Sequence, residues 1–124
     1  MYFYESPKHS KSKSFDFAVR VIKLYKFLKK NYSEYELSQQ LLRCGTAVGA
    51  LIREAEHGES RKDFLHKLNI SLKEANECVY WLDLLHATDY INKRMYESMM
   101  KDAVELLKML ISSVKTTKNK TQVK

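Results

Sequence analysis

The sequence predicts an all-α protein, an antiparallel up-down-up-down four-helix bundle with flexible basic tails. Only three Gly and one Pro occur among its 124 residues, and a sandwich or barrel needs many more of these turn-forming residues. Apolar residues recur every three or four positions along most of the chain, which is the spacing of one helix face. A chain of this length is expected to form one domain with its own hydrophobic core.

The first two helices are predicted from capping residues and apolar spacing. Ser14 can cap a helix over residues 15–30. Ser33 and Glu36 form a capping box that opens a second helix, which ends near Gly58. The predicted apolar faces are Phe15, Ala18, Val21, Ile22, Tyr25 and Leu28 in the first helix, and Leu37, Leu41, Cys44, Val48, Leu51 and Ala55 in the second.

The third and fourth helices follow from the same signals. Ser60 and Asp63 form a looser capping box before a helix that continues to about His86. A short break at residues 88–92 separates it from a last helix that ends near Val114. Their predicted apolar faces are Phe64, Leu68, Ala75, Val79 and Leu82, and then Tyr96, Met99, Ala103, Leu106 and Leu110.

The positive charge of the chain lies mostly at its two ends. Of the formal net charge of +7, residues 1–13 hold +2, residues 14–114 hold +1 and residues 115–124 hold +4. We therefore expect a polar lead, a bundle and a basic tail with these limits. Basic tails favour solubility and also attract polyanions, so the charge alone does not identify a nucleic-acid-binding protein.

A cytoplasmic location without a membrane partner is expected. No apolar stretch approaches the roughly 20 residues that span a bilayer. The first residues, MYFYESPKHSKSKS, lack the apolar run of a signal peptide.

Two cysteines, Cys44 and Cys78, fall inside apolar helical stretches and are predicted to be reduced core residues. If the second and third helices turn near Gly58, the two cysteines are about 9 Å out of register at 1.5 Å per residue. That offset argues against a disulfide, whose Cα atoms approach within about 7 Å.

The second and third helices carry a set of residues that resembles a known family. The segments are LLRCGTAVGALIREA and GESRKDFLHKLNISLKEANECVYWLDLL. Their specific parts are Arg43 with Gly45-Thr46, Glu54-Ala55, Ser60 with Lys62-Asp63-Phe64, Ser71-Leu72-Lys73-Glu74, Glu77 and Tyr80-Trp81-Leu82. From about Phe15 to Val114 the chain resembles the four-helix-bundle proteins related to the 23S rRNA intervening-sequence proteins.

This resemblance implies a closed helical bundle, ring-like homo-oligomers that are pentamers in some members, no established catalytic activity and a suspected link to RNA or DNA. The family pattern usually has Ser and Asn where this chain has Ala47 and Leu51. If the family's Ser and Asn form a shared polar site, these residues cannot provide it here. If they only fill space in the bundle, little is lost.

Two polar features are candidates for function. Arg43 and Glu74 lie nearly level across the second and third helices, which predicts a buried interhelical ion pair. A compact basic face on the first helix, together with the tail, is either a solvated surface or a site that contacts nucleic-acid phosphates. The residues of that candidate site are Arg20, Lys23, Lys26, Lys30, Lys115, Lys118 and Lys120.

Three carboxylate-x-x-His pairs offer an alternative, a small helical metal protein or enzyme: Glu54/His57, Asp63/His66 and Asp83/His86. Di-iron bundles use Glu-x-x-His on two helices, but they also need inward Glu residues from the other two. The first helix offers only Asp16 as an acid. Since phosphate loops, CxxC pairs and hydrolase triads are also missing from the sequence, we expect no enzyme, metal or other cofactor.

Self-association is predicted from unbalanced apolar surface. A first helix of about 24 Å beside helices of about 35 and 39 Å leaves the corner between the second and third helices uncovered. We expect the N-terminal aromatic residues of a neighbouring subunit to dock there, in a ring-like homo-oligomer, with a pentamer favoured by the resemblance. The predicted interface residues are Tyr2, Phe3, Tyr4, Leu51, Ile52, Phe64, Leu65 and Trp81.

Overall fold

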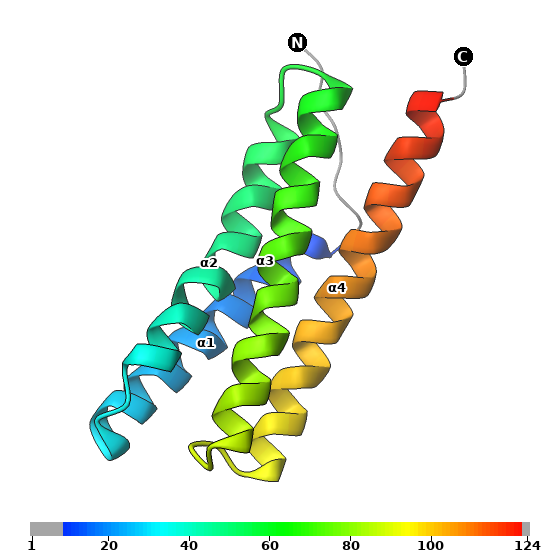
Figure 1. Ribbon diagram of the computed structural model, residues 1–124. Coiled ribbons are helices and arrows are strands. Elements are labelled where there is room, and N and C mark those ends of the chain that lie inside the picture. The colour runs from blue at the N-terminus through cyan, green and yellow to red at the C-terminus, as the bar shows by residue number, and fades with distance from the viewer. Residues whose placement is uncertain (1–8, 123–124) are drawn as a thin grey trace.

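The computed structural model describes residues 9–122, with side chains as far as residue 119. This part of the chain folds into four helices (Figure 1), which are α1 at Ser10–Tyr32, α2 at Glu36–Glu56, α3 at Arg61–Ala87 and α4 at Lys93–Gln122. The predicted all-α class and the order of the helices are confirmed.

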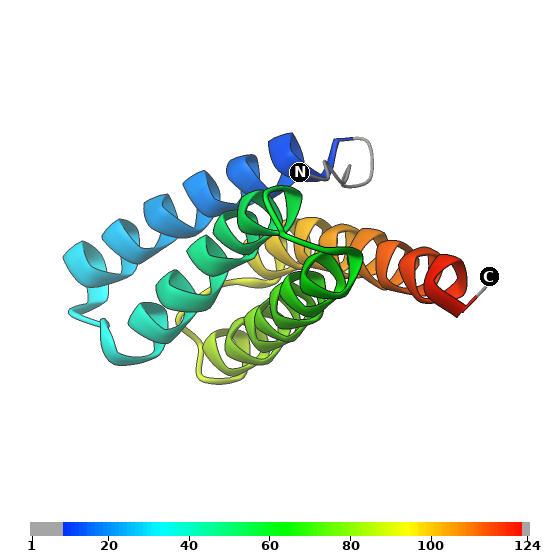
Figure 2. The ribbon, with the colours of Figure 1, turned by 90° about the horizontal axis from the view of Figure 1, so that it is seen from above.

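The helices run alternately up and down along the bundle (Figure 1). Short connections at residues 33–35, 57–60 and 88–92 force consecutive helices to pack antiparallel. Seen from above, α1 and α4 flank the central pair of α2 and α3 (Figure 2). The contact between α1 and α4 closes the bundle and is less extensive than those between consecutive helices.

Helix α1 is longer than predicted and turned about its axis. It begins at Ser10 and spans about 34 Å over its 23 residues. Its buried stripe includes Ser10 and Ser14, so Ser14 is a core position and not the predicted cap. Phe15 and Ile22, predicted to face the core, are 57% and 37% exposed. The prediction failed because Ser14 was taken for a helix cap and Ser10 for part of a polar lead.

The connections confirm one predicted cap and correct another. Ser33 has a left-handed backbone, φ 52°, and ends α1 instead of opening α2. The carboxylate of Glu34 caps α2, since it accepts the backbone N–H of Ser38 at 2.8 Å. At the start of α3 the predicted box is present, because Ser60 Oγ accepts the N–H of Asp63 at 3.0 Å.

Helix α4 continues past the predicted end at Val114 to Gln122. Val114 and Thr117 are both buried and extend the buried stripe of Leu110 at helical spacing. The polar composition of residues 115–122 had indicated a flexible tail, but no Gly or Pro interrupts the helix there and lysine is a good helix former. The bundle therefore extends beyond both predicted limits, residues 14 and 114.

One apolar core runs through the bundle and receives side chains from every helix. Its largest fully buried members include Phe17, Leu28, Leu41, Ile52, Leu68, Leu82, Leu85, Leu106 and Leu110. None of the helices in the described part of the chain is long and apolar enough to cross a membrane.

Candidate nucleic-acid interface

Two lysines near the start of α1 attach this helix to the rest of the bundle. Lys11 Nζ lies 2.7 Å from a carboxylate oxygen of Glu56 in α2. On the other side, Lys13 Nζ lies 2.6 Å from Glu105 in α4. The pKa of Lys13 is raised by its hydrogen bond to Glu105, and the same bond lowers the pKa of Glu105.

Arg20, predicted to belong to the basic face, also connects α1 to α4. Its guanidinium lies 2.5 Å from an oxygen of Asp102. It also donates to the hydroxyl of Ser98 at 2.7 Å and to the Ser98 carbonyl at 3.2 Å. Arg20 is therefore engaged in holding α1 against α4, although its side chain is still 38% exposed.

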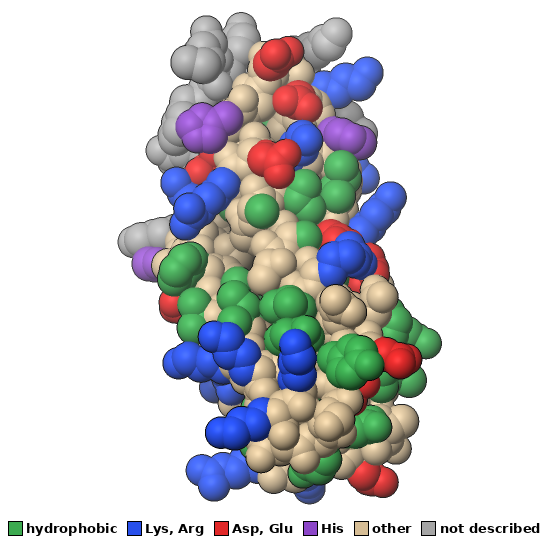
Figure 3. Space-filling view, turned by 90° about the vertical axis from the view of Figure 1, so that its left-hand side faces the viewer, with side chains coloured by type: hydrophobic (Ala, Val, Ile, Leu, Met, Phe, Trp, Pro, Cys, Tyr) green, Lys and Arg blue, Asp and Glu red, His purple; other side chains and the backbone are tan. Residues whose placement is uncertain are grey.

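The four lysines that follow differ from these paired cations. Lys23, Lys26, Lys29 and Lys30 are all exposed, and residues 17–33 contain no Asp or Glu. None of the four takes part in the ion pairs found among residues 9–119. Figure 3 shows Lys and Arg side chains gathered toward the lower left of the molecule, on a face with few acidic side chains at that end. We call these four residues the lysine face.

The predicted basic residues do not form one continuous site. Lys115 and Lys118 are exposed near the C-terminal end of α4, which lies at the opposite end of the bundle from the C-terminal end of α1 (Figure 1). The side chain of Lys120 lies outside the described residues. The structure thus separates the helix-1 lysines from the C-terminal lysines.

Beside the lysine face a groove opens between α1 and α4, and the sequence analysis did not find it. Its cavity volume is about 260 Å³. It is lined by Arg20, Lys23, Leu24, Phe27, Met95 and Met99. Phe27 is 40% exposed, and its ring lies 6.1 Å, centroid to centroid, from the ring of Tyr32. No signal in the α1 sequence could place Met95 and Met99 there, because they come from the far end of the chain.

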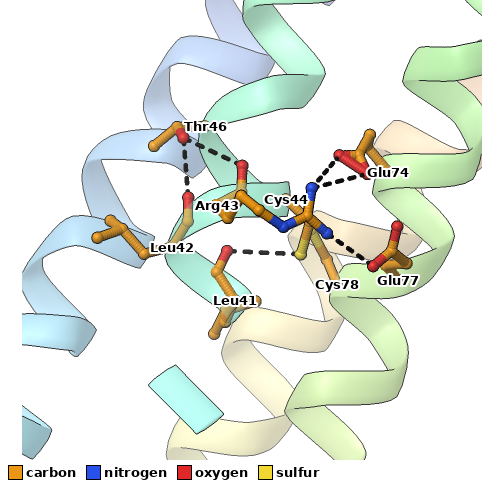
Figure 4. Close-up of polar contacts among 8 residues, drawn as sticks. All are labelled: Leu41, Leu42, Arg43, Cys44, Thr46, Glu74, Glu77 and Cys78. Atoms are coloured by element: carbon orange, nitrogen blue, oxygen red, sulfur yellow. Dashed lines mark hydrogen bonds and ion pairs between the residues drawn. The ribbon is translucent and has the colours of Figure 1, made fainter. Parts of the chain in front are cut away.

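The predicted pair of Arg43 and Glu74 is present, but it lies at the surface. Arg43 donates to Glu74 at 3.0 Å and also to Glu77 at 2.8 Å, reaching from α2 to α3 (Figure 4). The Arg43 side chain is 54% exposed and that of Glu74 is 12% exposed. Burial, together with a hydrogen bond to Glu77, raises the pKa of Glu74, and Arg43 opposes that shift.

The two cysteines face one another, contrary to the prediction from register. Their Sγ atoms lie 3.3 Å apart across α2 and α3, and both thiols are free and buried. Side chains lean toward the N-terminus of their helix. Cys44 therefore leans away from the turn while Cys78 leans toward it, which reduces the expected offset. The hydrogen bond to Cys44 and burial both raise the pKa of Cys78.

The acidic members of the carboxylate-x-x-His pairs have other contacts. Asp63 accepts the backbone N–H of Glu59 at 3.2 Å within the α3 cap. Asp83 accepts the hydroxyl of Tyr96 at 2.5 Å, and the His86 ring stacks on that tyrosine at 4.2 Å. Over the described residues, no group of three or more His, Cys, Asp or Glu side chains could hold a metal ion.

The predicted oligomer interface is corrected at two positions. Ile52 is fully buried and Phe64 is 3% exposed, so both belong to the protomer's own core. The longer α1 reaches the corner between α2 and α3, as the ion pair of Lys11 with Glu56 shows. Leu51, Leu65 and Trp81 are half-buried. Tyr2, Phe3 and Tyr4 lie outside the described residues.

The comparison with known proteins decides the family. The family model described as 23S rRNA-intervening sequence protein matches residues 9–112. The chain belongs to the 23S rRNA intervening-sequence protein family. It is similar to a crystal structure of a protein of unknown function from the S23 ribosomal protein family of Bacteroides thetaiotaomicron VPI-5482. The identity is 55% and the TM-score is 0.84, over 86% of this chain and 98% of that chain. No curated protein matches the chain.

Several residues that carry the resemblance to the 23S rRNA intervening-sequence proteins hold helices together. The hydroxyl of Ser71 donates to the backbone carbonyl of Val48 at 2.9 Å and joins α3 to α2 inside the core. A methyl group added at Gly45 would lie 2.9 Å from Val21, so this glycine lets α1 and α2 approach closely. Ala47 and Leu51, the positions that depart from the family pattern, are half-buried.

Proposed function

We propose that this protein is a non-enzymatic, homo-oligomeric helical bundle whose lysine face binds the phosphates of RNA or DNA without sequence preference. The observation that carries the proposal is the contrast along α1. Lys11, Lys13 and Arg20 have carboxylate partners on neighbouring helices. The four lysines of the lysine face have none among the ion pairs of the described chain, and they stand on a helix held by core residues.

Phosphate binding by such a surface is electrostatic. Each lysine that neutralises a phosphate releases counterions, so the affinity falls steeply as salt is added. Contacts to phosphates position a protein on nucleic acid but do not read its sequence. The names of the family and of its crystallised member, which refer to 23S rRNA and to a ribosomal protein family, also support a polyanionic partner.

The test compares two variants that change the same amount of charge. Lys23, Lys26 and Lys30 are replaced with Glu in one variant, and Lys62, Lys73 and Lys108, which are exposed on α3 and α4, are replaced with Glu in the control. Binding to a labelled RNA duplex of arbitrary sequence is titrated at several salt concentrations. We expect the first variant to lose binding and the control to keep most of it.

The salt dependence of binding measures how many phosphate contacts are lost. Removing three phosphate contacts is expected to reduce the slope of log affinity against log salt by about 2 to 3. A third variant, with Lys115, Lys118 and Lys120 replaced with Glu, measures the other end of the bundle. Equal losses in the α1 variant and in the control would show a general charge effect and would overturn the assignment to the lysine face.

Assembly is the second part of the proposal. Phe15 and Ile22 are seven positions apart on α1, so they share one face, and both are exposed. Burying the part of each side chain that is still exposed would contribute about 1 kcal/mol. We expect light scattering to give the mass of a ring-like oligomer, with a pentamer favoured by the resemblance, and replacement of both residues with Ser to shift it toward the monomer. A monomeric wild-type protein would overturn this part.

A further inference from the structure

The lysine face is interleaved with exposed aromatic rings. Phe27 follows Lys23 by four positions and precedes Lys30 by three, so the three side chains are neighbours on the surface of α1. The ring is 40% exposed beside the α1/α4 groove. An aromatic face between two cations is the arrangement with which proteins hold unpaired bases and their phosphates together.

Further rings continue from Phe27 toward the loop between α3 and α4. Tyr32 is 52% exposed, and its ring contacts Phe27 at 6.1 Å and Tyr90 at 5.9 Å, both edge to face. We call Phe27, Tyr32 and Tyr90 the aromatic row. Because these rings come from α1 and from a loop some sixty residues later, only the folded bundle brings them together.

The groove adds space for one flat ring. Its volume of about 260 Å³ lies between Phe27 and Leu24 of α1 and Met95 and Met99 of α4, and Lys23 stands at its edge. Thioether sulfur atoms make favourable contacts with the edges of aromatic rings. A base of a duplex cannot reach such a site without leaving its stack, whereas an unpaired base can enter at little cost.

We infer that the α1/α4 groove and the aromatic row bind unpaired bases while the lysine face holds the adjoining phosphates, so the preferred partner is single-stranded nucleic acid. This inference rests on the proposed function, because it uses the same lysines for the phosphates. It adds a preference for single strands over duplexes, which a lysine face alone does not provide.

The test replaces Phe27 with Leu, which keeps apolar bulk and removes the ring. Tyr80→Leu is the control, since Tyr80 of α3 is another exposed aromatic residue, 57% exposed, and does not line the groove. Each variant and the wild type are titrated with a short labelled RNA and with the same RNA annealed to its complement. Thermal unfolding and light scattering show whether fold and assembly are retained.

We expect wild type to bind the single strand more tightly than the duplex. Phe27→Leu should weaken single-strand binding about 5- to 100-fold, the loss that one stacked base accounts for, and should leave duplex binding unchanged. The ratio between this variant and wild type should stay constant as salt is added, because stacking releases no counterions.

Several results overturn the inference and leave the proposed function standing. Equal binding of single strand and duplex by wild type is one. Retention of the single-strand preference in Phe27→Leu is another. If Phe27→Leu changes the oligomeric mass but not this preference, the groove belongs to a subunit contact. If wild type binds neither RNA, both the proposed function and this inference fail.

Discussion

Substituting Gly45 with Ala tests how α1 and α2 are held together. A methyl group on Gly45 would lie 2.9 Å from Val21 Cγ2 and 3.0 Å from Val21 Cγ1, closer than side-chain carbons normally approach. Val21 is fully buried and, being β-branched, has little rotamer freedom in a helix. Neither group can move aside, so α1 and α2 must separate or the core must distort.

Two opposing contributions determine how Gly45→Ala changes the free energy of unfolding. Ala is favoured over Gly within a helix by about 1 kcal/mol, whereas forcing an extra methyl into a packed core costs about 1 to 3 kcal/mol. We therefore expect Gly45→Ala to lower the free energy of unfolding by up to about 2 kcal/mol. In a Val21→Ala background both clashing methyl groups are gone and only the 3.2 Å contact with Cβ of residue 21 remains. Gly45→Ala should then raise the free energy of unfolding, by up to about 1 kcal/mol.

The assay is urea unfolding of the wild type, both single variants and the double variant. Ala50→Gly, at an exposed position of α2, measures helix propensity alone and should cost about 1 kcal/mol. The coupling between contacting residues is the difference between the two Gly45→Ala effects. If Gly45→Ala changes the free energy of unfolding in the same direction in the wild-type and the Val21→Ala backgrounds, the close approach of α1 to α2 does not determine its effect and the reasoning is refuted.

Three further predictions concern the ion pair, the thiols and the end of α4. Burial raises the pKa of Glu74, so folding favours the protonated form of this carboxyl. The stability gained from that preference is present at low pH and is lost as the pH rises through the raised pKa. Arg43→Ala should therefore destabilise by about 1 kcal/mol at neutral pH, with a deficit that shrinks on acidification; a pH-independent deficit would contradict this. Both thiols are buried and the pKa of Cys78 is raised, so Ellman's reagent should label neither before unfolding, and rapid native labelling would contradict that. Deleting residues 115–124 removes the end of α4 with its buried Thr117 and should cost about 1 kcal/mol in urea unfolding, whereas a flexible tail would leave stability unchanged.

The fold could be predicted because its main determinants are local. The apolar spacing of Leu41, Val48 and Ala55 defines one face of α2, and all three are buried. The capping box of Ser60 and Asp63 also depends only on neighbouring residues and was found correctly. The stripe of α1 was misplaced because Ser10 and Ser14 fill narrow space between helices, and that role appears only when the partner helix is known.

The candidate site was less predictable because it joins distant segments. The distance between the cysteines depends on how two helices are staggered and which way their side chains lean, which a count from the turn does not capture. The apolar face predicted for the first helix did not include Phe27. Its significance depends on Met95 and Met99 of α4 and on Tyr90, and contacts between such separated residues follow only from tertiary packing.

The helix dipole accounts for only part of the lysine face. Lys29 and Lys30 lie in the last turn of α1, where the negative end of the dipole stabilises cations. This effect falls off within one turn, so it does not account for Lys23 and Lys26. The ion pairs seen among residues 9–119 leave these two without a carboxylate. The dipole therefore does not account for these two lysines, and the phosphate binding proposed above would give both a negatively charged partner.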